Sequence, residues 1–282
     1  MTASEGGRKA SLLLCRPGCR RTRRFCLQSQ GLNRRCSVTP PKKAVDARSI
    51  ATPSAHPCSD LHPWNIQRPE RAIDAIAVLT FDGFNELDSF IAAAILNRLR
   101  AQGWEAYITS PTEEVTSMNG VTVRRQKPLA FAAEADAVLI GSGIKTREIA
   151  ADADLLGQLR LDSVRQLIGA QCSGTLLLAK LGLIGTLPAC TDLTTKPWVI
   201  DAGVEVLDAP FVAHGNVATA GGCLAAQYLA AWLIARGAGT QAAREAIHYV
   251  APVGEKEETV ARALRAVSPF LLAEAELSDR CG

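Results

Sequence analysis

The 282-residue sequence has little aromatic content, only four histidines and no long apolar run. Its apolar stretches are broken by Gly, Asp or Lys before they reach the roughly 18 residues of a membrane-spanning helix, so we expect no membrane segment and a soluble protein. No phosphate-binding loop, dinucleotide fingerprint or internal repeat is present. The histidines also lack the spacing of metal ligands. We therefore expect neither a metal site nor a cofactor, and we interpret the late histidines, His214 and His248, as structural or surface residues.

Acidic residues are scarce in the first quarter of the chain. Residues 1–71 hold 14 Lys or Arg against 4 Asp or Glu (+10), whereas the remainder holds 17 against 24 (−7). The basic segment is rich in Ser, Pro and Gly and has no periodicity, which predicts a disordered leader. The apolar run at residues 11–15 is too short for a signal peptide. Three interpretations of this segment are open: an inert leader that is not part of the functional protein, a transit peptide, or a nucleic-acid-binding tail. We favour the inert leader.

The nine cysteines do not form a recognisable framework. Five lie in the leader with spacings unlike those of a zinc site, and the other four are too few and scattered for a set of disulfides. A reducing compartment fits this usage, so we expect a cytoplasmic protein. Cys190 and Cys223 are interpreted as buried fillers, because free cysteine usually behaves as a small apolar residue.

From residue 72 onward, apolar runs of strand length alternate with segments of helical periodicity, which predicts an α/β fold with a parallel sheet. Ligands in such sheets bind at the carboxyl ends of the strands, here the loops 82–88, 141–143 and 171–174. We expect one domain at residues 72–255 and a helical tail at residues 256–282. The predicted strands are residues 76–81, 104–108, 135–140, 165–171 and 217–220, with an antiparallel excursion near 121–125; the predicted helices are residues 86–100, 149–161, 224–235 and 241–249.

Residues 165–183 predict a strand that turns sharply into a helix, with Cys172 at the turn. Ala170 and Gly174 are the small neighbours that a nucleophile elbow needs. A cysteine at the start of a helix faces the positive end of the dipole, so we expect a lowered thiol pKa. Cys172 is therefore the first candidate for chemistry.

Four segments in this order carry a resemblance to a known family: residues 81–88, 141–143, 172–174 and 215–222. Together they resemble the ThiJ/PfpI superfamily, with its class I glutamine amidotransferase-like fold, and within it the isocyanide hydratase-like branch. The resemblance covers about residues 73–255. It implies a flavodoxin-like parallel-sheet sandwich, a reactive cysteine at the elbow and a homodimer.

The resemblance also implies roles for individual residues. Asp88, ahead of Glu86, is the acid that hydrogen-bonds Cys172, and Ser173 supplies the hydroxyl that follows the cysteine. Backbone groups near Gly143 and Ser173 would stabilise developing charge. The oxyanion or binding positions implied are Gly141, Ser142, Gly143 and Gly174, and the pocket candidates are Asp192, Gly221 and Gly222.

The sequence departs from many family members in having no histidine beside the cysteine. Ser173 follows Cys172, and Asp192 stands where relatives carry a downstream histidine. Without a Cys/His couple, peptidase and glyoxalase chemistry are disfavoured. The resemblance then implies a cysteine-dependent hydratase or hydrolase acting on a small electrophile such as an isocyanide.

Two other functions stay open. A reactive thiol at Cys172 could be a non-catalytic sensor of oxidative stress. A ligand-binding regulator is the other, since AraC-type regulators append a DNA-binding region to a similar domain. The mildly acidic segment after residue 253, about thirty residues, is short for such a module, so we expect no nucleic-acid partner.

Overall fold

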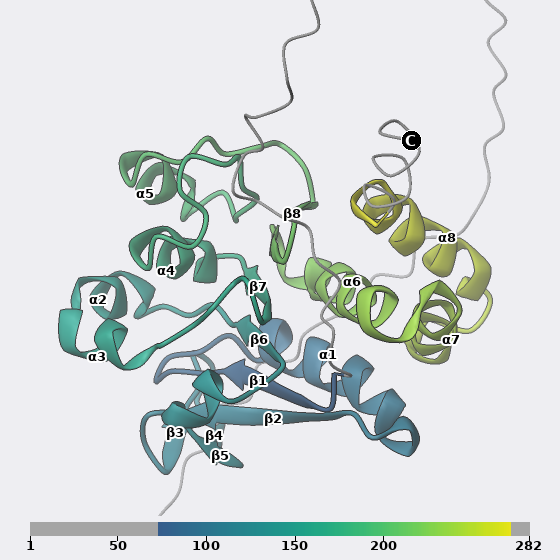
Figure 1. Cartoon of the computed structure of the whole chain (residues 1–282), viewed down its shortest axis with the longest axis horizontal. Coiled ribbons are helices and arrows are strands. Elements are labelled where there is room, and N and C mark those ends of the chain that lie inside the picture. Colours follow the sequence, from purple (N-terminus) through teal and green to yellow (C-terminus); the bar gives the residue numbers. More distant parts are fainter. Residues whose placement is uncertain (1–72, 272–282) are drawn as a thin grey trace, which may run out of the picture. The chain divides into compact units, whose positions relative to one another are not determined.

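The computed structural model describes residues 73–271. Its centre is a seven-stranded sheet in the order β5-β2-β1-β6-β7-β9-β8, and β3 and β4 form a separate hairpin (Figure 1). The prediction of an α/β fold with a mostly parallel sheet is confirmed. The strands are β1 (Ala75–Leu79), β2 (Glu105–Ser110), β3 (Glu114–Thr116), β4 (Thr122–Arg124), β5 (Lys127–Pro128), β6 (Ala137–Ile140), β7 (Leu167–Gln171), β8 (Phe211–His214) and β9 (Val217–Ala220).

Helices cover both faces of this sheet (Figure 1). One layer contains α1, α6, α7 and α8, and the other contains α2, α3, α4 and α5. The α-helices are α1 (Glu86–Leu96), α2 (Thr146–Ala151), α3 (Ala153–Gln158), α4 (Gly174–Lys180), α5 (Lys196–Asp201), α6 (Ala226–Ala238), α7 (Thr240–Val250) and α8 (Lys256–Val267); 3₁₀ helices span Asn97–Gln102, Leu129–Ala133, Cys223–Ala225 and Ser268–Phe270.

The central strands are apolar on both faces, as a covered parallel sheet requires. In β1, Ile76 and Val78 pack into the core under α1 and α6, whereas Ala77 and Leu79 pack into the core under α4. The parallel partners β2 and β6 flank β1 on its two sides. This two-sided burial explains why the strand is a continuous apolar run in the sequence.

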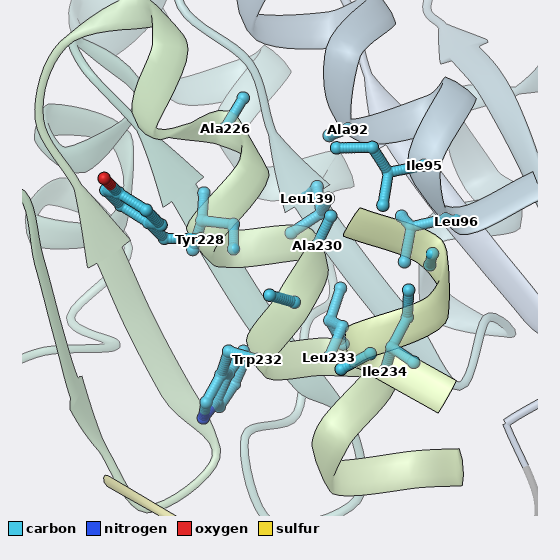
Figure 2. Close-up of a cluster of buried hydrophobic side chains, with 14 of the residues drawn as sticks. Ala92, Ile95, Leu96, Leu139, Ala226, Tyr228, Ala230, Trp232, Leu233 and Ile234 are labelled. Carbon is cyan, nitrogen blue, oxygen red and sulfur yellow. The ribbon is translucent and has the colours of Figure 1, made fainter. Parts of the chain in front are cut away.

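Helix α6 forms the centre of the larger core. Trp232, Leu233 and Ile234 are fully buried, and Ile95 and Leu96 of α1 lie beside them (Figure 2). Alanines along α6 have small side chains, so neighbouring elements can approach its backbone closely. Helix α8 packs on the same core through Val260 and Val267.

Several expected elements differ from those observed. The single helix predicted over 149–161 is wrong: α2 ends at Ala151, and Asp152, in extended backbone, accepts a hydrogen bond from the Leu155 N–H (2.9 Å) and caps α3. The helix predicted to reach residue 100 leaves the α conformation after Leu96 and continues as a 3₁₀ helix. Strand β8 and helix α5 were not predicted. The antiparallel excursion is confirmed as the β3–β4 hairpin.

The strand order determines where a site can form. From β1 the chain first adds β2 on one side and later adds β6 on the other, so the order reverses between β1 and β6. Ligands in such sheets bind at this reversal, beyond the carboxyl ends of the strands. The ends of β1, β6, β7 and β9 all lie along that edge. Within residues 73–271, no helix is both long and apolar enough to cross a membrane.

The predicted leader, 1–71, and the last part of the predicted tail, 272–282, lie outside the described residues. The division of the chain at residues 71 and 255 stays a prediction.

Candidate active site

Cys172 lies at the turn between β7 and α4 in a strained conformation. Its φ is +48°, and within the described range it is the sole non-glycine residue with a positive φ. Such backbone costs of order 1–3 kcal/mol and persists only where surrounding contacts enforce it. Here the Cys172 N–H donates to the Ala220 carbonyl (2.8 Å), and the Cys172 carbonyl accepts from Thr191 Oγ1 (2.7 Å). The elbow is therefore held from both sides by neighbouring elements.

Gly174 begins α4 directly against the end of β6. A Cβ at this position would lie 2.6 Å from the Ile140 carbonyl oxygen and 2.8 Å from that of Gly141. Both are backbone atoms that cannot rotate away, so a larger residue would force α4 off the sheet. This is the physical reason for a small residue two positions after Cys172.

The three loops expected at this edge are joined by hydrogen bonds. The Asn85 N–H donates to the Ser142 carbonyl (2.8 Å), and the Ile144 N–H donates to the Gly83 carbonyl (3.0 Å). The Gly143 N–H donates to Ser173 Oγ (3.1 Å). The loops after β1, β6 and β7 thus form one connected unit around Cys172.

Asp88, in the first turn of α1, is the acid that reaches the cysteine. Its side chain is 2% exposed, and an oxygen of its carboxylate lies within 4.8 Å of the Cys172 sulfur. Ser142 Oγ donates a short hydrogen bond to Asp88 Oδ2, while Oδ1 meets no N–H or O–H donor among the described residues, and the Cys172 and Cys223 thiols are the other donors to this carboxyl. Burial raises the pKa of Asp88, and the Ser142 hydrogen bond opposes that rise.

Glu86, the second candidate, is directed elsewhere. Its carboxylate accepts from Ser117 Oγ (2.5 Å) and Asn119 Nδ2 (2.8 Å), which anchors the turn of the β3–β4 hairpin. Its side chain stabilises that turn and is not part of the group at Cys172.

The thiol pKa differs from the sequence-based expectation. Burial, followed by the negative charge of Asp88, raises the pKa of Cys172 well above its usual range. The expected lowering by the helix N-terminus is wrong, because α4 has only seven residues and the thiol is 4% exposed beside a carboxyl group. Burial and the neighbouring carboxyl group therefore both disfavour the thiolate form of Cys172.

Ser173 directs its hydroxyl into the loop after β6. Its Oγ accepts from the Gly143 N–H and lies 2.7 Å from Thr146 Oγ1, which itself donates to the Gly143 carbonyl (2.8 Å). The Gly143 N–H therefore already has a hydrogen-bond acceptor, Ser173 Oγ, and does not point to a substrate as a free donor. In this arrangement Ser173 positions the loop relative to the elbow.

Gly141 and Gly143 lie so close to neighbouring atoms that neither position has room for a side chain. A Cβ on Gly141 would lie 2.8 Å from Ser89 Oγ, and one on Gly143 would lie 2.6 Å from the Gly83 carbonyl oxygen. Close approach of the loops after β1 and β6 therefore depends on both glycines. Without that approach, Ser142 could not reach Asp88.

Cys223, interpreted above as a filler, belongs to the site. Its sulfur, the Cys172 sulfur and an Asp88 carboxylate oxygen all lie within 4.8 Å of one another. Asn85 Nδ2 donates to Cys223 Sγ (3.2 Å), and burial raises the pKa of this half-buried thiol. In the sequence, Cys223 could have been identified as a site residue from its position just after a predicted strand. That inference also requires knowing that β9 pairs with β7. Cys190, in contrast, lies outside this cluster, and burial raises its thiol pKa to about 12.

The pocket candidates Asp192, Gly221 and Gly222 lie on the loops next to the elbow. Asp192 Oδ1 accepts from the backbone of Thr194 (2.9 Å) and Thr195 (3.0 Å), and its charge contributes to the raised pKa values of Asp88 and Cys172. Gly221 lies against the backbone of Thr191 with no room for a Cβ. Asp192 therefore adds negative charge near the elbow, and Gly221 allows close contact between two loops beside it.

Gln171 links the elbow to the loop after β9. Its Nε2 donates to the Gly222 carbonyl (2.7 Å) and lies 3.6 Å from Cys172 Sγ. Gly222 itself has φ +89°, which glycine adopts without strain. The loop that carries Cys223 is thereby tied to the strand that carries Cys172.

The two histidines within residues 73–271 lie away from this edge. His214 pairs with Val217, at the opposite end of β9, and its Nε2 lies 2.8 Å from the Pro188 carbonyl oxygen. His248 is on α7 beside Glu257. The described chain therefore brings a carboxyl group and a second thiol to Cys172, and no histidine.

Comparison with known proteins identifies the family. The model of the DJ-1/PfpI family matches residues 74–236, which contain the whole elbow and both loops that join it. The chain belongs to the DJ-1/PfpI family. No curated protein matches the sequence significantly.

Solved structures of the DJ-1/PfpI family share this fold. The DJ-1 superfamily protein STM1931 from Salmonella typhimurium aligns with a TM-score of 0.55 and 22% identity, over 62% of this chain and 96% of that one. Drosophila melanogaster DJ-1beta gives 0.55 and 23%, over 63% and 97%. A ThiJ/PfpI family protein from Pseudomonas syringae gives 0.56 and 19%, over 78% and 97%. At these identities the likeness establishes the fold alone.

Proposed function

We propose that this DJ-1/PfpI family protein is a cysteine-dependent hydratase that adds water to a small electrophile of the isocyanide class. The observation that carries the proposal is the buried pair formed by Cys172 and Asp88, with no histidine beside it in the described chain. In this pair the carboxyl group can take the proton from the thiol and pass it on to the substrate. An isocyanide needs this transfer, because its carbon gains one proton when the sulfur attacks.

The first step uses Asp88 as the base. In the resting site Cys172 holds its proton, because burial and the Asp88 charge disfavour the thiolate. Asp88, whose own pKa is raised by burial, is a stronger base than an exposed aspartate and can take that proton when substrate arrives. The thiolate then attacks the isocyanide carbon, and Asp88 returns the proton to that carbon. The product of this step is a thioimidate.

The second step is hydrolysis of the thioimidate. Water adds to the same carbon, one of its protons goes to the nitrogen, the C–S bond breaks, and the sulfur takes the other proton as the N-formamide leaves. The overall reaction adds one water to one isocyanide. At the start of α4 the N–H groups of Thr175 and Leu176 donate to the carbonyls of Cys172 (3.2 Å) and Ser173 (3.0 Å), so the N–H groups of Ser173 and Gly174, at the elbow itself, are the ones that would stabilise developing charge. Ser142 holds Asp88 in place throughout.

An electrophile screen tests the proposal. Isocyanides, nitriles and 2-oxoaldehydes would be incubated with the wild-type chain, Cys172→Ala and the matched control Cys190→Ala, and formamide or other products measured. We expect isocyanide turnover that is lost in Cys172→Ala and kept in Cys190→Ala. Full turnover in the Cys172→Ala variant would overturn the covalent route, and turnover of 2-oxoaldehydes alone would overturn the substrate class.

The oxidation sensor ranks second. Selective oxidation favours a thiol that is largely ionised, and the pKa of Cys172 is raised by burial and by Asp88. Mass spectrometry after mild peroxide treatment separates the two functions. Oxidation of Cys172 far in excess of Cys190, without turnover of any electrophile, would favour the sensor.

The homodimer implied by the family is also part of the proposal. Leu87 and Leu224 are 51% and 66% exposed, and each is adjacent in sequence to a residue of the cysteine cluster. A second copy placed over them would cover apolar surface next to the site. Light scattering of the wild-type chain and of Leu224→Glu would test this, with a monomer expected for the variant and a monomeric wild type counting against it.

A further inference from the structure

Three side chains that can ligate a metal converge at the elbow from three different loops. Asp88 comes from the first turn of α1, Cys172 from the end of β7 and Cys223 from the 3₁₀ turn after β9. The two sulfurs and one carboxylate oxygen all lie within 4.8 Å of one another. A tetrahedral zinc ion with Zn–S bonds of about 2.3 Å needs sulfurs roughly 3.8 Å apart, so small side-chain adjustments would close the site.

A second observation points to a missing partner. Asp88 is 2% exposed, yet its Oδ1 atom meets no N–H or O–H donor among the described residues, and the thiols of Cys172 and Cys223 are the only other donors to this carboxyl. A thiol is a weak donor, so a buried carboxylate oxygen of this kind calls for an explanation such as an ion. The other oxygen, Oδ2, is held by Ser142, which fixes the carboxylate in place. Metal-binding carboxylates are typically oriented by a hydrogen bond of this kind.

We infer that Asp88, Cys172 and Cys223 form a binding site for a thiophilic divalent cation of the zinc class. Two sulfur ligands and one carboxylate select zinc and its heavier relatives over magnesium or calcium, which prefer oxygen ligands. Three protein ligands leave a fourth position for water. Asn85 Nδ2, which donates to Cys223 Sγ at 3.2 Å, would orient and stabilise the second thiolate.

Binding of the cation should release two protons, one from each thiol. The ion forms bonds to two sulfurs and one carboxylate oxygen, and each thiol gives its proton to solvent. With two protons released, affinity rises by about 100-fold per pH unit while both free thiols are protonated. Cys172 cannot bind the ion and attack an electrophile at once, so the cation would inhibit the hydratase reaction. The binding inference itself does not depend on that reaction.

Metal binding to the full chain, measured without any substrate, tests this site. Because Cys15, Cys19, Cys26, Cys36, Cys58 and Cys281 lie outside the described residues, the background would be the full chain with these six cysteines replaced by Ser. Zn²⁺ affinity would be measured by competition with a chromophoric chelator. Cd²⁺ would report sulfur bonds through its thiolate charge-transfer absorption.

We expect one tight Zn²⁺ per chain in this background, with two protons released and two Cd–S bonds. Cys223→Ser should weaken binding by more than about 100-fold, beyond the effect of losing an outer hydrogen-bond partner. Cys190→Ser, which alters a buried cysteine outside the cluster, should leave affinity unchanged. Near-ultraviolet circular dichroism would verify that each variant is folded.

Absence of tight binding in the folded background, or unchanged affinity in folded Cys223→Ser, would overturn the inference. Release of one proton with a single Cd–S bond would overturn it as well, because Cys223 would then not be a ligand. A failed electrophile screen alongside intact metal binding would refute the hydratase alone.

Discussion

The core around α6 and the edge that carries Cys172 are both buried, but they are built on opposite principles. Around α6, Trp232, Leu233 and Ile234 are fully buried among other apolar side chains, and the unpartnered polar atom there, Trp232 Nε1, belongs to a neutral ring. At the edge, Asp88 is equally buried with one oxygen that meets no N–H or O–H donor among the described residues, and Cys172 has a backbone conformation that favours glycine. The first region stabilises the fold, whereas the second retains features that cost stability.

This difference indicates which residues carry function. A carboxyl group and a thiol that both resist ionisation, placed together at the ends of parallel strands, serve no packing purpose that alanine or leucine would not serve better. Features of this kind persist where chemistry needs them. Substitutions should therefore have opposite effects on stability in the two regions.

The largest expected effect is in the core. Trp232→Ala should lower the free energy of unfolding by about 3–5 kcal/mol, because it leaves a large cavity beneath α6. Urea denaturation followed by circular dichroism would measure it. A loss below about 1 kcal/mol would mean that the α6 core collapses around the cavity. The core would then contribute no more to stability than the edge that carries Cys172.

Asp88→Asn should have the next largest effect, on activity. The amide cannot take the Cys172 proton, so turnover of the isocyanide should fall by about 100- to 1,000-fold. In the wild type, turnover should also fall as the pH drops through the raised pKa of Asp88, because the protonated acid is no base. Steady-state rates against pH would show this, and a profile identical in Asp88→Asn would contradict the role of Asp88.

The same variant should be more stable than the wild type. Because the folded-state pKa of Asp88 is raised, the native protein binds this proton more tightly than the unfolded chain does. The stability of the wild type therefore decreases as pH rises from the ordinary aspartate value of about 3.9 through the raised pKa. At neutral pH we expect Asp88→Asn to gain about 1 kcal/mol, and to lose this advantage in acid. Thermal unfolding of the wild type and of Asp88→Asn at several pH values would measure the difference. Equal melting temperatures at neutral pH would contradict the prediction.

The smallest effect compares two substitutions at one position. At Cys172, with φ +48°, Gly should be more stable than Ala by about 0.5–1 kcal/mol, since left-handed backbone strains any residue with a Cβ. At Cys190, which is not in that conformation, the order should reverse. Chemical denaturation of the four variants gives both differences. Ala as stable as Gly at residue 172 would show that the elbow is unstrained.

The elbow was predictable from the sequence because it depends on a local pattern. An apolar strand that ends in small residues before a helix indicates Cys172, whereas Asp88 was identified through the family resemblance of residues 81–88. Cys223 was not predictable, because its place beside Cys172 depends on β9 pairing with β7, a contact between residues about fifty positions apart. The direction of the Ser173 hydroxyl also depends on a distant partner, the loop at Gly143.

The half-exposed position of Cys223 has a consequence for how this fold can diversify. Its 3₁₀ turn follows Gly222, which has open space around it, and precedes Leu224, which is largely exposed. Cys172, by contrast, is held by backbone contacts from Ala220 and Thr191. A substitution at position 223 can thus exchange the second thiol for another side chain while the elbow keeps its shape. One scaffold with a fixed nucleophile and an interchangeable neighbour can supply different chemistries without redesign of its core.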